Sequence, residues 1–172
     1  MTRSEPPSRW SRRRVLASIG TGIATAAAGC TGSNSIGGEP TYEEGTVGDL
    51  NVSDNASRSA SEMSTAAALA DQQVSTSVTP LDALELTDHE FVVESGYLGS
   101  TVQGTVEHTG SSRVQTVEVR TRVYDDAGTL LDRYLATTGD LNAGSSWAFQ
   151  VIVLEAPSDV GSYDITVLGT PT

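Results

Sequence analysis

The chain has 172 residues and a formal net charge of −12, and all ten of its basic residues are arginine, so it contains no lysine. The first 29 residues carry five arginines and one glutamate, a charge of +4, which leaves −16 for the remainder. This acidity disfavours nucleic acid and anionic membrane surfaces as partners, because both bind clustered Lys or Arg. A single cysteine excludes an intrachain disulfide.

The sequence pattern of residues 1–29 predicts a lipoprotein signal peptide of the twin-arginine type. A basic stretch precedes an apolar run from residue 15 to 28, which is shorter than the ~20 residues of a membrane-spanning helix. "SRRRVL" resembles the twin-arginine export signal, with Arg12 and Arg13 as the export motif, and "AAGC" resembles a lipoprotein cleavage box. The resemblance implies that Cys30 becomes the first mature residue and carries a lipid that anchors the exported chain to the outer face of the cell membrane. A soluble secreted chain and an uncleaved N-terminal anchor are the alternatives.

Residues 30–58 are rich in Gly, Ser, Asn and acids without a sustained period, which predicts a flexible acidic linker. Asn51 and Asn55 each begin an acceptor pattern for N-glycosylation. Residues 59–80 predict a short helix and a connector, because Ser59 and Glu62 have the spacing of a capping box and Pro80 follows.

Residues 81–172 predict a β-sandwich domain, because short runs alternate between apolar and polar residues and are separated by turn signals. We expect six strands, beginning with Glu90–Glu94. The residues expected to face inward on the later strands are Val102, Gly104, Val106, Val117, Val119, Thr121, Val123, Trp147, Phe149, Val151, Val153, Tyr163, Ile165 and Val167. The expected fold class is all-β, an immunoglobulin-like antiparallel β-sandwich preceded by the signal peptide, the acidic tether and the short helix.

The segment "TRVYDDAG", with "GTVEHTG" before it and "GDLNAGSSWAFQV" after it, resembles the FxLYD domain of prokaryotic exported proteins, which occurs often in haloarchaeal lipoproteins. Tyr124 and Asp125 match the signature, whereas Thr121 and Val123 stand where phenylalanine and leucine are expected. The resemblance covers about residues 88–168 and implies an immunoglobulin-like extracytoplasmic fold without a catalytic site.

The lysine-free, acidic composition resembles that of proteins from extremely halophilic archaea. Acidic groups that repel one another in dilute buffer are screened at molar salt, where the Debye length is about 3 Å. We therefore expect the protein to be more stable at high salt.

The sequence predicts no enzyme, no cofactor and no metal site. Neither His89 nor His108 has the spacing of a catalytic triad or a zinc site, and Asp125, Asp126 and Asp132 fit a polar hairpin better than a calcium loop. Two functional hypotheses follow. The first is a lipid-anchored cell-surface module with a non-catalytic binding, structural or envelope-associated role, whose protein or envelope partner is unknown. The alternative is an accessory subunit or ligand receptor of a membrane transporter or redox complex.

Overall fold

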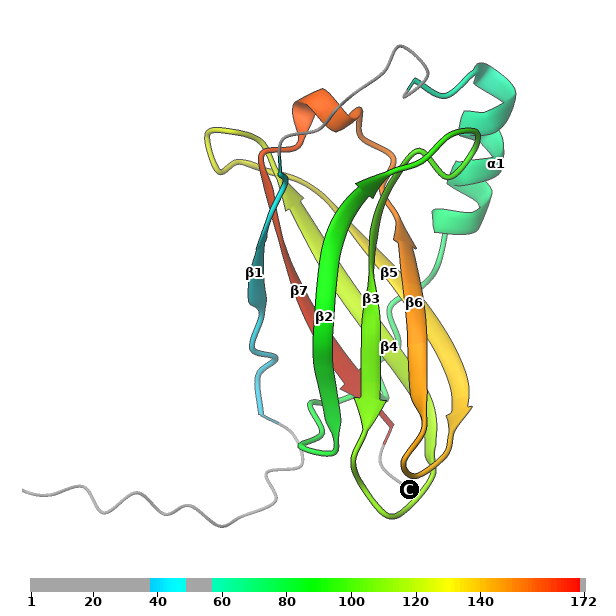
Figure 1. Ribbon diagram of the computed structural model, residues 1–172, viewed down its shortest axis with the longest axis vertical. Coiled ribbons are helices and arrows are strands. Elements are labelled where there is room, and N and C mark those ends of the chain that lie inside the picture. The colour runs from blue at the N-terminus through cyan, green and yellow to red at the C-terminus, as the bar shows by residue number, and fades with distance from the viewer. Residues whose placement is uncertain (1–37, 49–56, 171–172) are drawn as a thin grey trace, which may run out of the picture. The chain divides into compact units, whose positions relative to one another are not determined.

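The computed structural model describes residues 38–48 and 57–170, which form two packed antiparallel sheets and one short helix (Figure 1). The elements of this part of the chain are β1 (Glu43–Thr46), α1 (Ala60–Ala70), β2 (Leu84–Val93), β3 (Ser100–His108), β4 (Val114–Tyr124), β5 (Leu130–Leu141), β6 (Ser146–Ile152), a 3-10 turn (Pro157–Asp159) and β7 (Ser162–Gly169). One sheet has the strand order β1-β7-β4-β5, and the other has the order β2-β3-β6. The expected β-sandwich is therefore confirmed.

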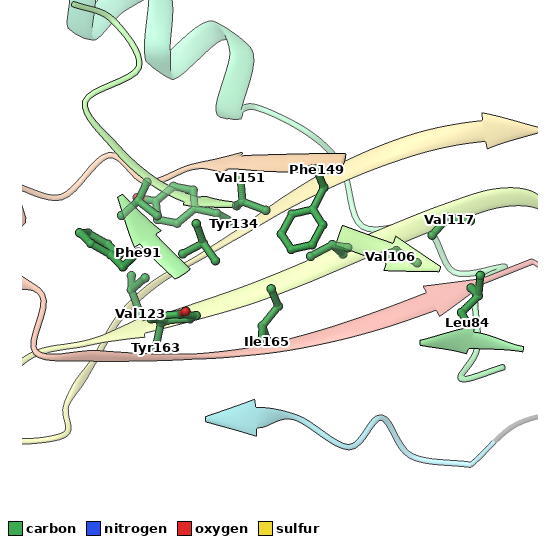
Figure 2. Close-up of a cluster of buried hydrophobic side chains, with 14 of the residues drawn as sticks. Leu84, Phe91, Val106, Val117, Val123, Tyr134, Phe149, Val151, Tyr163 and Ile165 are labelled. Carbon is green, nitrogen blue, oxygen red and sulfur yellow. The ribbon is translucent and has the colours of Figure 1, made fainter. Parts of the chain in front are cut away.

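The core lies between the two sheets, where the inward rows of both meet (Figure 2). On β4 the predicted row of Val117, Val119, Thr121 and Val123 is fully buried, and opposite it β3 buries Val102 and Val106 completely. Burial of each such aliphatic side chain stabilises the fold by roughly 1.5–3 kcal/mol relative to exposure. The alternation of apolar and polar residues in the sequence therefore correctly predicts which face of β3 and β4 is turned toward the core.

Gly104 is required by a close approach inside the three-stranded sheet. A Cβ at this position would lie 2.2 Å from the carbonyl oxygen of Asp88 and 2.7 Å from the Phe149 ring. Because Gly104 pairs directly with Phe149 across β3 and β6, the missing side chain leaves the space that the ring occupies.

The positions of two strands and the burial of Trp147 differ from the expectation. Residues 43–46, predicted to be part of a flexible linker, form β1 and pair antiparallel with β7 from Glu43 opposite Ile165 to Thr46 opposite Ser162. The first strand of the three-stranded sheet begins at Leu84 rather than Glu90. Trp147 packs against the core but is only half-buried, because it lies near the start of β6.

Helix α1 confirms the predicted capping box. The Ser59 hydroxyl accepts a hydrogen bond from the Glu62 amide at 3.4 Å, and the Glu62 carboxylate accepts one from the Ser59 amide at 2.8 Å. The hydrogen bond from the Ser59 hydroxyl lowers the pKa of Glu62. These reciprocal bonds satisfy amide groups that have no partner inside the first turn of a helix.

The sandwich has two distinct ends (Figure 1). At one end, called here the tether end, lie the β3–β4 loop (109–113), the β5–β6 turn (142–145) and the N-terminal end of β1. At the opposite end, called here the far end, lie the β2–β3 loop (94–99), the β4–β5 turn (125–129) and the β6–β7 connection (153–161). The chain therefore enters the sheet from the tether end.

Candidate functional site

The residues that the sequence assigns to export, lipid attachment and glycosylation lie outside the described residues. They are Arg12, Arg13, Cys30, Asn51 and Asn55. The candidate sites described below therefore consist of other residues than those predicted from the sequence.

Both histidines lie on strands, as expected. His89 on β2 shares a hydrogen bond with the Tyr163 hydroxyl at 2.8 Å, and its Nε2 lies 4.0 Å from a Glu43 carboxylate oxygen. Burial, followed by the charge of Glu90, raises the pKa of Tyr163 to about 12. The contact connects β2 with β1 and β7.

The second histidine, His108, is buried at the tether end. Its Nδ1 lies 2.9 Å from the carbonyl oxygen of Asn142, to which it donates a hydrogen bond. The backbone amide of His108 also donates to the Ser145 carbonyl at 2.9 Å. His108 therefore fixes the β5–β6 turn against the end of β3.

Polar residues cluster on the outer face of the four-stranded sheet. Arg122 on β4 donates two hydrogen bonds to Asp164 on β7, one of them 2.7 Å long, and the Tyr124 hydroxyl donates to the same carboxylate at 3.1 Å. The Asp164 hydrogen bonds raise the pKa of Arg122. The Arg122 guanidinium also lies 3.7 Å from the ring centroid of Tyr42, which brings the residue before β1 onto this face.

Glu118 is fully buried, although its place in the β4 alternation predicts that it faces outward. It does lie on the outer face of the sheet, where the connector after α1 covers it. The Ser75 amide donates to Glu118 Oε2 at 3.0 Å, Arg120 donates to Oε1, and Arg120 Nη2 donates to the Ser75 carbonyl at 2.9 Å. A buried carboxylate with these partners joins the connector to the sheet.

A groove of about 530 Å³ lies along the edge strands β1 and β2. Its apolar lining includes Leu81, Leu84 and Leu86, and its ionisable lining residues are Glu43, Asp82 and Glu85. Because all of these ionisable lining residues are acidic, the groove would attract a cationic ligand. Within the described residues, no group of three or more His, Cys, Asp or Glu side chains is placed to hold a metal ion.

The β4–β5 turn at the far end has the predicted polar hairpin geometry. Asp125 accepts hydrogen bonds from the Thr129 amide at 2.7 Å and from the Ala127 amide at 2.9 Å, and Gly128 has a φ of 78°. The Thr129 hydrogen bond lowers the pKa of Asp125. The Asp125 carboxylate therefore stabilises the turn through hydrogen bonds to its backbone amides.

Comparison with known proteins identifies a similar protein whose name states no activity. The uncharacterized protein MJ0360 of Methanocaldococcus jannaschii is 29% identical over 155 residues, which cover 89% of this chain and 90% of that protein. No family model matches the chain. No solved structure matches it. Among the described residues, no helix is both long enough and apolar enough to cross a membrane.

Proposed function

We propose that this protein is a lipid-anchored surface module, in which Cys30 carries the lipid and an immunoglobulin-like sandwich presents its far end to a protein or envelope partner. The observation that carries the proposal is the entry of the chain at the tether end through β1 (Figure 1). Twelve residues separate Cys30 from Glu43, which span at most about 43 Å when extended. Such an anchor would keep the tether end near the membrane and leave the far end exposed.

The strand order supports an immunoglobulin-like assignment, which is the fold that the FxLYD resemblance implies. With β1 set aside, β2 to β7 follow the order A, B, C, C′, E and F, because β2-β3-β6 corresponds to A-B-E and β7-β4-β5 corresponds to F-C-C′. In such a sandwich the last strand, G, pairs with F. Here β1 pairs with β7 at that place. An N-terminal strand would thus substitute for the usual C-terminal one.

Lipid attachment is tested by fractionating cells that express the full chain or its Cys30→Ser variant. We expect the first in the membrane fraction with a lipid-modified N-terminal cysteine, and the second released from it. Membrane retention of Cys30→Ser would contradict the anchor. Replacing both Arg12 and Arg13 with Lys should leave an intracellular precursor, and unchanged export would contradict the twin-arginine route alone.

The orientation is tested with cysteines placed at exposed positions on opposite ends. Asp126→Cys lies in the far-end turn, and Ser111→Cys lies in the β3–β4 loop of the tether end. On intact cells, a membrane-impermeant maleimide should label the first faster than the second. Equal labelling on cells, with equal labelling of the purified variants, would contradict the proposed presentation.

The groove along the edge strands β1 and β2 favours a second candidate function. In this function the protein is a ligand receptor or an accessory subunit of a membrane transporter or redox complex. The leucine and acidic lining residues of the groove suit a ligand that combines a positive charge with an apolar group. Isothermal titration of the full chain with short arginine- and leucine-containing peptides tests this reading, with Asp82→Asn/Glu85→Gln as the weakened variant. Equal heats for both proteins would exclude the groove as the binding site.

A further inference from the structure

The side chain of Arg58, the last residue of the sequence-predicted linker, is bound by backbone carbonyl groups of the far end. Its Nε donates to the Tyr97 carbonyl at 2.9 Å, and its Nη2 donates to the Val153 carbonyl at 2.8 Å. Nη2 also donates to Leu98, while the contacts with Ser100 at 3.3 Å and Leu154 at 3.4 Å are longer. The guanidinium is therefore enclosed by carbonyl oxygens from the β2–β3 loop, the start of β3 and the segment after β6, called here the carbonyl cage.

The carbonyl cage is built by backbone geometry of its own. Gly96 and Gly99 in the β2–β3 loop have φ values of 74° and 50°, a conformation that other residues adopt rarely. The Val153 amide donates to the Ser100 carbonyl at 2.9 Å, which joins the two walls. A Cβ on Gly99 would lie 2.5 Å from Arg58 Nε, so the glycine also gives the guanidinium room. The walls are thus held together by contacts in which Arg58 takes no part.

A buried carboxylate beside the carbonyl cage supplies negative charge. Glu155 Oε1 accepts a hydrogen bond from the Tyr134 hydroxyl at 2.9 Å. Glu155 Oε2 is buried and has no hydrogen-bond partner among the described residues. Burial lowers the pKa of Arg58, and the charges of Tyr134 and Glu155 oppose that effect. Burial is the larger effect, so the hold on the guanidinium comes from its converging carbonyl acceptors. One Glu155 carboxylate oxygen still has an unused capacity to accept a hydrogen bond.

We propose that the far end contains a guanidinium-binding site and that Arg58 is its built-in ligand. A guanidinium is planar, carries five N–H donors and is weakly hydrated, so it can satisfy several converging carbonyl groups that a compact ammonium or potassium ion would contact less completely. Removal of the Arg58 side chain leaves a site that free guanidinium, or an arginine side chain, fills. The inference does not depend on lipid attachment or surface location.

The test is chemical rescue of the full chain carrying Arg58→Ala. Millimolar guanidinium chloride is titrated while KCl is adjusted to keep the ionic strength constant, and the melting temperature is followed by circular dichroism. The variant should melt below the wild type and recover saturably, by about 5 °C at ten times the dissociation constant of guanidinium. Wild type should show no such recovery, because Arg58 already fills the site.

Arg133→Ala is the matched control, because Arg133 is exposed on β5 and makes no ion pair within the described residues. An absent or unsaturable response in Arg58→Ala, or an equal response in Arg133→Ala or the wild type, would overturn the proposal. If Arg58→Ala does not fold, hydrogen exchange of the arginine Nε–H groups in the wild type decides the question by NMR. The Arg58 proton should exchange with water at least tenfold more slowly than that of Arg133, and equal rates would overturn the site.

Discussion

Replacing Arg120 with methionine should destabilise the protein strongly, because Glu118 would remain buried without its positive partner. Glu118 has a fully buried side chain, and the Arg120 side chain is 23% exposed. Removing one member of a buried ion pair costs roughly 3–5 kcal/mol, and the partial exposure of Arg120 places the expected loss near the lower end, about 3 kcal/mol. Among the residues that the structure describes, the Ser75 amide would be the remaining hydrogen-bond donor to Glu118.

The double variant Glu118→Gln/Arg120→Met should recover much of this loss. Both charges are then absent, and the glutamine amide oxygen can still accept from the Ser75 amide. We expect the free energy of unfolding of the double variant to be about 1–2 kcal/mol below that of the wild type. The effects of the two substitutions on stability should therefore be clearly non-additive. Urea denaturation followed by circular dichroism measures these differences without adding the salt that guanidinium chloride would supply.

Arg133→Met is the control for loss of a positive charge from β5 and should change stability by no more than about 0.5 kcal/mol. A loss below about 1 kcal/mol in Arg120→Met, or additive effects in the double variant, would refute the reasoning. Either result would mean that loss of Arg120 does not leave an uncompensated buried charge on Glu118.

Three further predictions follow from packing and charge. Gly104→Ala should destabilise the fold by about 1–3 kcal/mol in urea, because the new methyl group would overlap Phe149 and the Asp88 carbonyl, and unchanged stability would contradict that packing. Burial raises the pKa of Tyr163 from 10.0 to about 12. Protonated Tyr163 therefore contributes fully to the free energy of unfolding below pH 10, and about 3 kcal/mol of that free energy is lost as the pH rises through 12. Alkaline denaturation with Tyr163→Phe as the control tests this, and an identical pH profile would contradict it. With −16 on the chain after residue 29, the melting temperature should rise from dilute buffer to molar KCl, and a flat or falling series would contradict the halophilic interpretation.

The sequence predicted the elements whose signal is local. Alternation on β4 identified the buried row from Val117 to Val123, and the spacing of Ser59 and Glu62 identified the start of α1. Both signals are visible in a single stretch because a strand exposes alternate residues to opposite faces and a helix start needs its own hydrogen-bond acceptors. The β-sandwich followed from repeating the first signal along the chain.

The sequence could not predict features that depend on distant segments. Three of the four β1 residues are exposed and the buried one is Gly45, so the strand has no apolar alternation. Its position depends on Tyr163, whose ring occupies the space that a side chain on Gly45 would fill. Arg58 offered a weaker signal. It is one of five arginines after residue 30 in a chain without lysine, but neither composition nor spacing identifies its partners.

Three of these arginines join the predicted sandwich domain to parts of the chain that precede it. Arg122 stacks on Tyr42, Arg120 binds the Ser75 carbonyl, and Arg58 enters the carbonyl cage.

Among the described residues, most arginines therefore lie where residues 38–48 and 57–80 meet the sandwich, and most acidic side chains form no ion pair with arginine. Salt should act differently on the two groups, because screening is strong between exposed charges and weak inside the protein. The exposed pair of Arg113 and Asp140 should contribute little at molar salt, whereas the pair of Arg120 and the buried Glu118 should persist. High salt can thus relieve the repulsion among surface carboxylates while the arginine contacts continue to hold the N-terminal segments in place.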